Sequence, residues 1–183
     1  RVIMDLAEGE IKQNLNRFDS AQTFSKYINK SYCKTASLIA NSTKAAGVLC
    51  NLEVEQLNHL YEFGKNIGLA FQVVDDILDF TGNDKQLGKP AVSDLASGYL
   101  TAPVLYALEE NENLSVLINR ELVEKEDLNN ALNIVMNSQA IKRSRKLAED
   151  FALHSKEALL WLPDSEYKRA LLSLPEFVLS RLY

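Results

Sequence analysis

The segment EVEQLNHLYEFGKNIGLAFQVVDDILDF (53–80) carries the longest uninterrupted helical pattern in the sequence. Its apolar residues recur at intervals of three and four, which is the spacing of one face of an α-helix. The turn-forming residues TGND (81–84) end the pattern. We therefore expect one long helix over residues 53–80.

The rest of the chain shows the same spacing in shorter segments. Ser20 is a candidate N-cap for the second helix, and Pro103 is typical of a first helical turn. We expect residues 81–93 to form a loop, and no segment has the pattern of a β-strand. The expected helices cover residues 2–13, 20–33, 34–49, 102–108, 114–121, 124–137, 139–161 and 165–181. The sequence thus predicts an all-α protein, with residues 1–183 in a single domain.

Composition narrows the class of protein. The chain is 46% hydrophobic and 25% charged, which is typical of one soluble globular domain. Its net charge of −5 argues against a broad nucleic-acid-binding face. Cys33 and Cys50 form neither a CxxC motif nor a disulfide framework, so we expect a reducing compartment. No apolar run reaches the ~20 residues of a membrane span. We see no targeting peptide, and we expect the true N-terminus to lie upstream of Arg1.

Three aspartates interrupt the apolar end of the long helix. At about 100° per residue, Gln72, Asp75, Asp76 and Asp79 fall on one arc of the helix. These carboxylates repel one another, and they lie where the helix dipole is already negative. A solvated acidic stripe, or pairing with Arg and Lys, would explain them. Their apolar neighbours favour a bound cation, and Mg²⁺ prefers one or two carboxylates with water and phosphate oxygens.

Other residues fit a phosphate ligand beside such a cation. Lys34 starts a segment of small residues, and Lys89 lies in a Gly-Lys-Pro loop shortly after Asp79. Either lysine alone is better explained by solubility, but an ammonium group is suited to phosphate. Asp94 is a candidate to cap the next helix or to orient Lys89. Gly64 and Gly68 lie in line on the long helix, which indicates close approach by another helix or a ligand.

Four segments, in order, resemble the trans-type isoprenyl diphosphate synthases. FQVVDDILDF (71–80) resembles the second aspartate-rich motif of that family, DDxxD, and AEGEIKQ (7–13) resembles its E-G-E-x-x-Q helix. YCKTASLIANSTKAAG (32–47) resembles the K-T-A-S-L helix, and LGKPAVSDLASGYLTAPVLYAL (87–108) resembles the G-K-P…G-x-x-T-x-P segment. The long-chain solanesyl and decaprenyl branch, which makes quinone side chains, is the most similar.

The resemblance implies a fold and a reaction. The isoprenoid synthase fold is an antiparallel helical array around a central cavity, usually in a dimer. The reaction extends an allylic diphosphate with isopentenyl diphosphate, and Mg²⁺ holds the leaving diphosphate. By resemblance, Asp75, Asp76 and Asp79 would bind Mg²⁺, and Lys34 and Lys89 would hold the allylic diphosphate. Thr35 and Gln72 would line the site, with Thr35 as a polar contact to the reacting centre.

Two departures from the family pattern matter. Tyr99 stands where many members carry a lysine, and the first aspartate-rich motif is missing. We therefore expect these 183 residues to be an inactive C-terminal portion, with apolar faces of 2–13 and 34–49 exposed. The alternatives are a non-catalytic subunit of a heteromeric synthase and, less favoured, a class I terpene cyclase. The resemblance implies a mitochondrial or plastid location in a eukaryote and a cytoplasmic one otherwise.

Overall fold

The computed structural model describes residues 2–82 and 92–183. Within these two ranges every regular element is helical and none is a strand, which confirms the all-α prediction. The N-terminal elements are α1 (Val2–Leu15), α2 (Phe24–Ser31), the π-helical turn η1 (Tyr32–Ala36), α3 (Ser37–Leu49) and α4 (Val54–Thr81). The C-terminal elements are α6 (Ser93–Ala96), α7 (Ala102–Glu110), α8 (Glu112–Asn119), α9 (Asp127–Asn137), α10 (Ala140–Glu157) and α11 (Glu166–Ser180).

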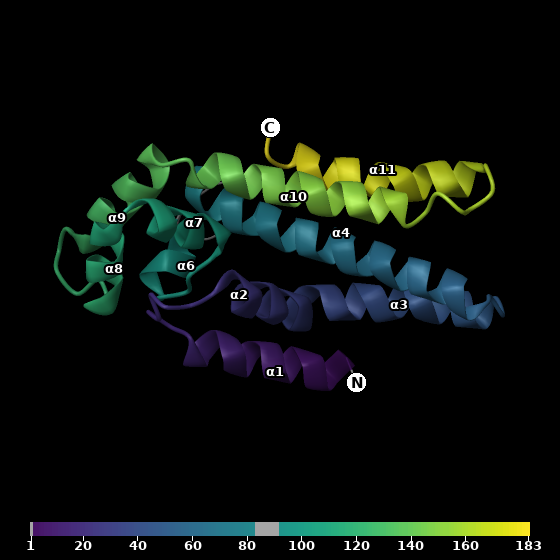
Figure 1. The fold of residues 1–183 in the computed structure, drawn as a ribbon, viewed down its shortest axis with the longest axis horizontal. Helices are drawn as coiled ribbons and strands as arrows, with labels where there is room; N and C mark the ends of the chain where they lie inside the picture. The colour runs from purple at the N-terminus through teal and green to yellow at the C-terminus, as the bar shows by residue number, and fades with distance from the viewer. Residues whose placement is uncertain (1, 83–91) are drawn as a thin grey trace.

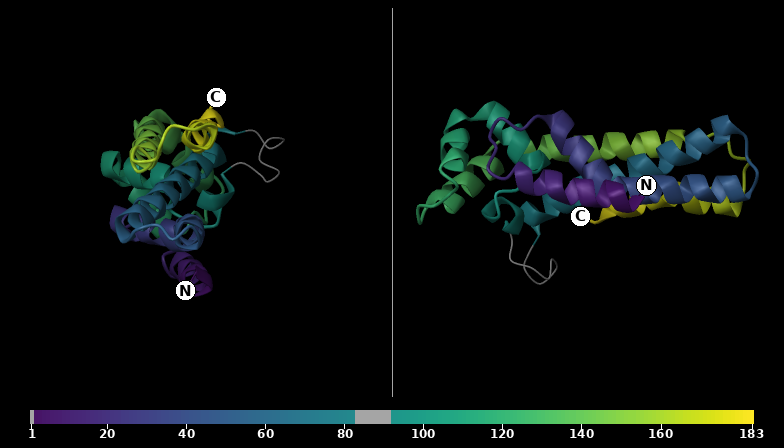
Figure 2. Two further views of the ribbon diagram at one scale, coloured as in Figure 1. Left: turned by 90° about the vertical axis from the view of Figure 1, so that its right-hand side faces the viewer. Right: turned by 90° about the horizontal axis from the view of Figure 1, so that it is seen from below.

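The long helix α4 forms the centre of the array. It packs against α3 on one side and against α10 on the other, and α11 packs against both α4 and α10. Figure 1 shows that α3, α4, α10 and α11 alternate in direction, while α6–α9 gather at one end. Viewed along the long axis, α1 and the end of α11 lie on opposite sides of the molecule (Figure 2). One cluster of buried residues joins the layers, from Tyr27 in α2 to Val178 in α11.

The predicted close approach at the two glycines of α4 is confirmed, and the neighbour is another helix. A Cβ atom added at Gly64 would lie 2.7 Å from the Ile39 carbonyl oxygen. One added at Gly68 would lie 2.6 Å from the Ala36 Cα atom. Because these contacts involve backbone, they cannot be relieved by rotating a side chain. The glycines therefore let α3 and η1 lie directly on α4, which holds the K-T segment beside the aspartates.

Two local predictions were wrong. The second helix begins at Phe24 and not near Ser20, because the Thr23 hydroxyl caps it by accepting the Lys26 backbone N–H at 3.3 Å. The short helix α6 had not been expected. It forms because the Asp79 carboxylate accepts the backbone N–H of Asp94, at 3.1 Å, in the first turn of α6. A helix start is stabilised by a negative group in this position.

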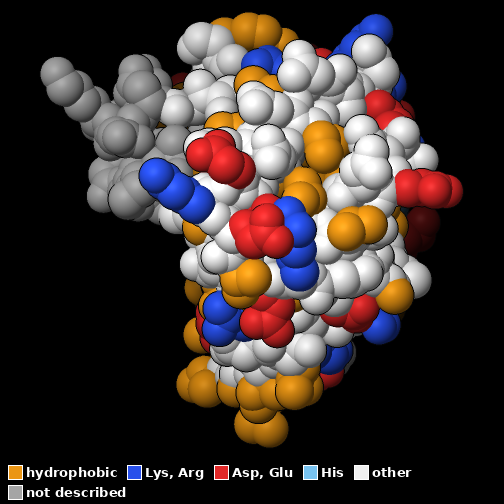
Figure 3. Space-filling view, turned by 90° about the vertical axis from the view of Figure 1, so that its left-hand side faces the viewer, with side chains coloured by type: hydrophobic (Ala, Val, Ile, Leu, Met, Phe, Trp, Pro, Cys, Tyr) orange, Lys and Arg blue, Asp and Glu red, His pale blue; other side chains and the backbone are white. Residues whose placement is uncertain are grey.

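Several apolar side chains remain exposed, as expected for 2–13 and 34–49. Those on α1 and α3 are Ile3, Met4, Leu6, Ile11, Leu15, Leu38, Val48 and Leu49. Figure 3 shows hydrophobic side chains gathered at the lower edge of one face, where α1 lies. Such faces are typical of contact with another protein surface. Among the described helices, none has the length and hydropathy needed to cross a bilayer.

Candidate active site

A polar cavity of about 220 Å³ lies where α1, α2, η1, α4 and the segment after α6 meet. Its lining residues are Gln13, Lys30, Lys34, Gln72, Asp75, Asp76, Asp94, Tyr99 and Thr101. Four of the predicted site residues, Lys34, Gln72, Asp75 and Asp76, thus face one space. Their positions in the sequence are far apart, and the packing of η1 on α4 brings them together.

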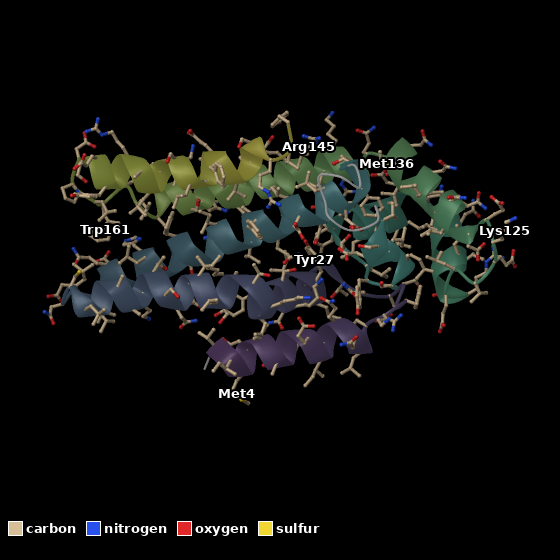
Figure 4. The ribbon with its side chains drawn as sticks, turned by 180° about the vertical axis from the view of Figure 1, so that it is seen from behind. Met4, Tyr27, Lys125, Met136, Arg145 and Trp161 are labelled. Atoms are coloured by element: carbon tan, nitrogen blue, oxygen red, sulfur yellow. The ribbon has the colours of Figure 1, made fainter. Side chains whose placement is uncertain are left out.

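Asp76 is the most constrained carboxylate of the cavity. It is 1% exposed and accepts hydrogen bonds from the Tyr27 hydroxyl at 2.6 Å and from the Gln72 amide at 2.9 Å. Figure 4 labels Tyr27, which lies between α2 and α4. Burial raises the pKa of Asp76 to about 6, although the charge of Lys30 and the two hydrogen bonds act in the opposite direction. Burial, together with the Asp76 charge, also raises the pKa of Tyr27.

Thr35 is connected to the Asp76 carboxylate through Gln72. Its hydroxyl donates to the Gln72 side-chain oxygen at 2.7 Å, and Gln72 in turn donates to Asp76. Thr35 is not among the residues that line the cavity. The structure therefore links Thr35 to Asp76 through two successive hydrogen bonds, with Gln72 between them, so Thr35 is in a position to orient Gln72.

Asp75 is more open than its neighbour. Its side chain is 44% exposed, and one carboxylate oxygen lies 3.5 Å from an Arg181 guanidinium nitrogen. Arg181 comes from the turn after α11, and it also lies over the Phe71 ring at 4.8 Å. Since an ion pair at this exposure contributes little, Asp75 is a carboxylate that a cation can reach.

Asp79 lies outside the cavity. It is 0% exposed, and its carboxylate accepts the Ser93 hydroxyl and the Asp94 backbone N–H, each at 3.1 Å. The expectation that all three aspartates open onto one cavity is therefore met by Asp75 and Asp76 and not by Asp79. In this structure Asp79 positions the start of α6, where Asp94 lines the cavity wall.

Lys34 reaches the cavity but is already paired. Its ammonium group lies 3.1 Å from a Glu10 carboxylate oxygen and donates to the Gln13 side-chain oxygen at 3.1 Å. Both partners belong to α1, in the segment that resembles E-G-E-x-x-Q. Lys89, predicted to approach the aspartates, lies outside the described residues.

Within residues 2–82 and 92–183, no three His, Cys, Asp or Glu side chains are grouped closely enough to hold a metal ion by themselves. The donor set still suits a hard cation that keeps most of its water, because Mg²⁺ often uses only one or two carboxylates. The described cavity lining carries three carboxylates and two ammonium groups, so it has a net negative charge that attracts a cation.

The sequence analysis did not predict that Lys30 and Thr101 line the cavity. Lys30 precedes Lys34 by four residues, and this i,i+4 spacing places two residues on one helical face. That spacing could have identified it. Thr101 belongs to the G-x-x-T-x-P segment, but nothing in its neighbours signals a hydroxyl that faces the cavity.

A family model and several known proteins are similar to this chain in sequence. The family model described as polyprenyl synthetase matches residues 1–135. The chain is 52% identical to a prenyl transferase of Synechocystis sp. over all of this chain and 56% of that protein. It is 46% identical to the chloroplastic solanesyl diphosphate synthase 2 of Arabidopsis thaliana, over all of this chain and 44% of that protein.

A solved structure shows the same arrangement of helices. The polyprenyl synthase of Caulobacter crescentus, crystallised with calcium and isoprenyl diphosphate, superimposes with a TM-score of 0.91 at 31% identity. The match covers all of this chain and 57% of that one. This chain spans about half the length of the curated relatives it matches. On the family model and these relatives together, the chain belongs to the polyprenyl synthetase family.

Proposed function

We propose that this chain forms one wall of the active site of a long-chain polyprenyl diphosphate synthase. The reaction joins an allylic diphosphate to isopentenyl diphosphate, with loss of inorganic diphosphate and a proton. The observation that carries the proposal is the single cavity shared by Lys34, Gln72, Asp75 and Asp76. Similarity to a solanesyl diphosphate synthase supports a long all-trans product, which would serve as a precursor of a quinone side chain.

Mg²⁺ is the cation that we propose for this site. The open carboxylate of Asp75 and the cavity-lining carboxylate of Asp76 would hold it, and Asp79 would support them through α6. When bound, Mg²⁺ offsets the negative charge on the oxygens of the leaving diphosphate. A net negative cavity would otherwise repel a diphosphate, so the carboxylates and the cation have to be considered together.

The remaining residues would bind the allylic diphosphate and orient the Asp76 carboxylate. Lys34 would supply a positive charge to the allylic diphosphate once its pairing with Glu10 is exchanged for a phosphate oxygen. Lys89 is proposed for the same role on the strength of the resemblance alone. Gln72 and Tyr27 each donate to one oxygen of the Asp76 carboxylate, and Thr35 donates to Gln72, so the carboxylate is held in one orientation. Such fixed groups stabilise charge without reorganising during the reaction.

The 183 residues contain one aspartate-rich motif. We propose that they are one part of a single all-α synthase domain and do not elongate a substrate by themselves. The exposed apolar faces of α1 and α3 are consistent with contact to further helices or to another subunit, in a homodimer or a heteromer. Similarity to a chloroplastic synthase favours a plastid location if the source is a eukaryote.

A non-catalytic subunit of a heteromeric synthase is the second candidate. The Thr35–Gln72–Asp76 chain of hydrogen bonds argues against it, because a subunit without chemistry gains nothing from a buried carboxylate held in place. A terpene cyclase of class I stays the least favoured alternative, because the relatives reported above are a prenyl transferase and a solanesyl diphosphate synthase.

The test is an elongation assay with Mg²⁺, farnesyl diphosphate and labelled isopentenyl diphosphate. We expect the full chain that contains this sequence to make polyprenyl diphosphate, and Asp75→Ala to abolish the product. We expect the 183-residue chain alone to make none. If the full chain is inactive but activates a second synthase subunit, the regulatory alternative is correct.

A further inference from the structure

Lys30 is the most deeply buried cation of the cavity. It lies at the end of α2, is 8% exposed, and points its ammonium toward the Tyr27 ring at 5.0 Å from the ring centroid. Within the described residues, the structure records no hydrogen bond or ion pair to this ammonium group. Burial lowers the pKa of Lys30, and the Asp76 charge acts in the opposite direction.

Thr101 has an unused hydroxyl in the same cavity. It precedes α7, is 2% exposed, and lines the cavity together with Lys30. Its hydroxyl oxygen has no hydrogen-bond partner among the described residues. A buried hydroxyl without a partner costs about 1–3 kcal/mol, so a retained one requires an explanation. Two buried donors thus belong to residues that line one polar cavity, and neither has an acceptor within the described part of the chain.

Lys34 contrasts with this pair. Its ammonium is held by Glu10 and Gln13 of α1, so a ligand has to compete for it. Tyr99, which also lines the cavity, donates its hydroxyl to Asn14 at 3.3 Å and carries no positive charge. Among the described lining residues, Lys30 and Thr101 are therefore two donors that a bound anion can engage without displacing a recorded hydrogen bond or ion pair.

We propose that Lys30 and Thr101 form a preformed anion-binding pair that holds the phosphate oxygens of a diphosphate group. The inference rests on the proposed function and adds two binding residues to it. The cavity volume of about 220 Å³ is far above the ~10–15 Å³ that one water molecule requires, so there is room for a larger group. The charged ammonium supplies affinity, and the hydroxyl supplies a directed hydrogen bond.

Asp76 does not remove the need for a ligand. It already accepts two hydrogen bonds, from Tyr27 and Gln72, and no contact with the Lys30 ammonium within ion-pair distance is recorded in the described chain. Lys30 is therefore attracted by the Asp76 charge over a longer range. The ammonium keeps its three donors for oxygens inside the cavity.

The experiment measures binding of inorganic diphosphate, in the presence of Mg²⁺, by isothermal titration calorimetry on the full chain. We expect Lys30→Met to weaken binding about ten- to a hundred-fold, since a hydrogen bond to a charged group is lost. Lys30→Arg should recover most of the affinity. The matched control is Lys26→Met, because Lys26 lies one turn earlier on α2 and pairs with Asp19 at 3.7 Å. This variant should bind like the wild type.

Thr101→Val tests the proposal where Lys30→Met fails to fold. The change removes a hydroxyl that has no partner, so the ligand-free protein should melt at the same or a higher temperature. Binding of diphosphate should nevertheless weaken about two- to ten-fold. A residue with only a structural role would not separate these two measurements.

The outcomes distinguish this inference from the proposed function. If the wild type binds diphosphate, and both Lys30→Met and Thr101→Val bind as tightly as the wild type, the pair has no binding role and the inference is wrong. If Lys34→Met weakens binding in that case, the proposed function still stands. If the wild type does not bind diphosphate with Mg²⁺ present, both the proposed function and this inference are overturned.

Discussion

Replacing Asp76 with asparagine should make this protein more stable at neutral pH, although it removes a proposed metal ligand. The Asp76 carboxylate is buried with a pKa of about 6, against an ordinary value of 3.8. Because the pKa is raised in the folded state, ionisation of Asp76 opposes folding. One pKa unit corresponds to about 1.4 kcal/mol, so the cost of ionisation is roughly 3 kcal/mol at most.

The sign of the pH dependence follows from the same shift. Below about pH 4, Asp76 is protonated in both the folded and the unfolded chain, and the variant gains nothing. As the pH rises through about 6, the unfolded chain holds fewer protons than the folded one, and the wild type loses stability. The variant has no such loss. Its advantage should therefore appear between pH 4 and pH 6 and stay constant above.

The hydrogen bond between Gln72 and residue 76 reduces the gain in free energy of unfolding that we expect from Asp76→Asn. Asparagine has an amide nitrogen where the carboxylate has its second oxygen, and that nitrogen would face the Gln72 amide donor. Rotation of the Gln72 amide, with the Thr35 hydroxyl as acceptor, relieves this contact. We expect a net gain of about 1–2 kcal/mol at pH 7.5, which for a chain of this length is about 2–8 °C in Tm.

The assay is urea and thermal unfolding followed by circular dichroism between pH 4 and pH 8. Asp164→Asn, at an exposed carboxylate, is the control for the change in net charge. A second arm adds Mg²⁺ and inorganic diphosphate, which should stabilise the wild type and not Asp76→Asn. If Asp76→Asn is equal to or less stable than the wild type over the whole pH range, burial does not control this carboxylate and our reasoning is refuted.

Three further predictions concern the neighbours of the cavity. Gly68→Ala should destabilise the protein by about 1–3 kcal/mol despite the better helix propensity of alanine, because the new Cβ meets backbone of η1. Gly47→Ala, whose Cβ would meet only the movable ends of Leu57 and Leu60, should cost less in the same urea titration. Glu10→Gln should tighten binding of inorganic diphosphate about two- to five-fold by calorimetry, since it frees Lys34 from a competing carboxylate; unchanged affinity would show that the pairing is irrelevant. Arg181→Gln should tighten Mg²⁺ binding, measured with diphosphate present, because Asp75 loses its cationic partner; weaker binding would mean that Arg181 contacts the ligand itself.

Much of the fold could be predicted because the helical pattern is strong and uninterrupted. The apolar spacing of 53–80 identified α4, and the two glycines on one row predicted the close approach that α3 and η1 make. One of the two errors has a local cause and the other a tertiary cause. The Thr23 hydroxyl, three residues after Ser20, caps α2 in place of Ser20. The start of α6 is stabilised by the Asp79 carboxylate, which belongs to α4 and not to the segment that forms α6. The second effect depends on a tertiary contact, which helical spacing does not contain.

The candidate site shows the same division between local pattern and tertiary contact. One helical arc predicted that Gln72, Asp75 and Asp76 share a face, and the cavity confirms it. The same arc includes Asp79, but α6 packs over that turn and buries it. Equal angles on a helix therefore do not imply equal access to solvent. What decides whether a carboxylate binds a ligand or caps a helix is the element that packs against its turn.

The two lysines that line the cavity, Lys30 and Lys34, explain why a charge pattern alone does not identify a phosphate site. Lys34 lies in the K-T-A-S-L segment that predicts a phosphate contact, yet its ammonium group is paired with Glu10 and Gln13 in this structure. Lys30 has only its i,i+4 spacing from Lys34 as a signal, yet it is buried beside the cavity, and no hydrogen bond or ion pair to its ammonium group is recorded within the described residues. The cost of burying an ammonium group is the physical signal, since a lysine that served only solubility would reach the solvent. That cost depends on how α2 packs against α4, so it becomes visible only in the folded chain.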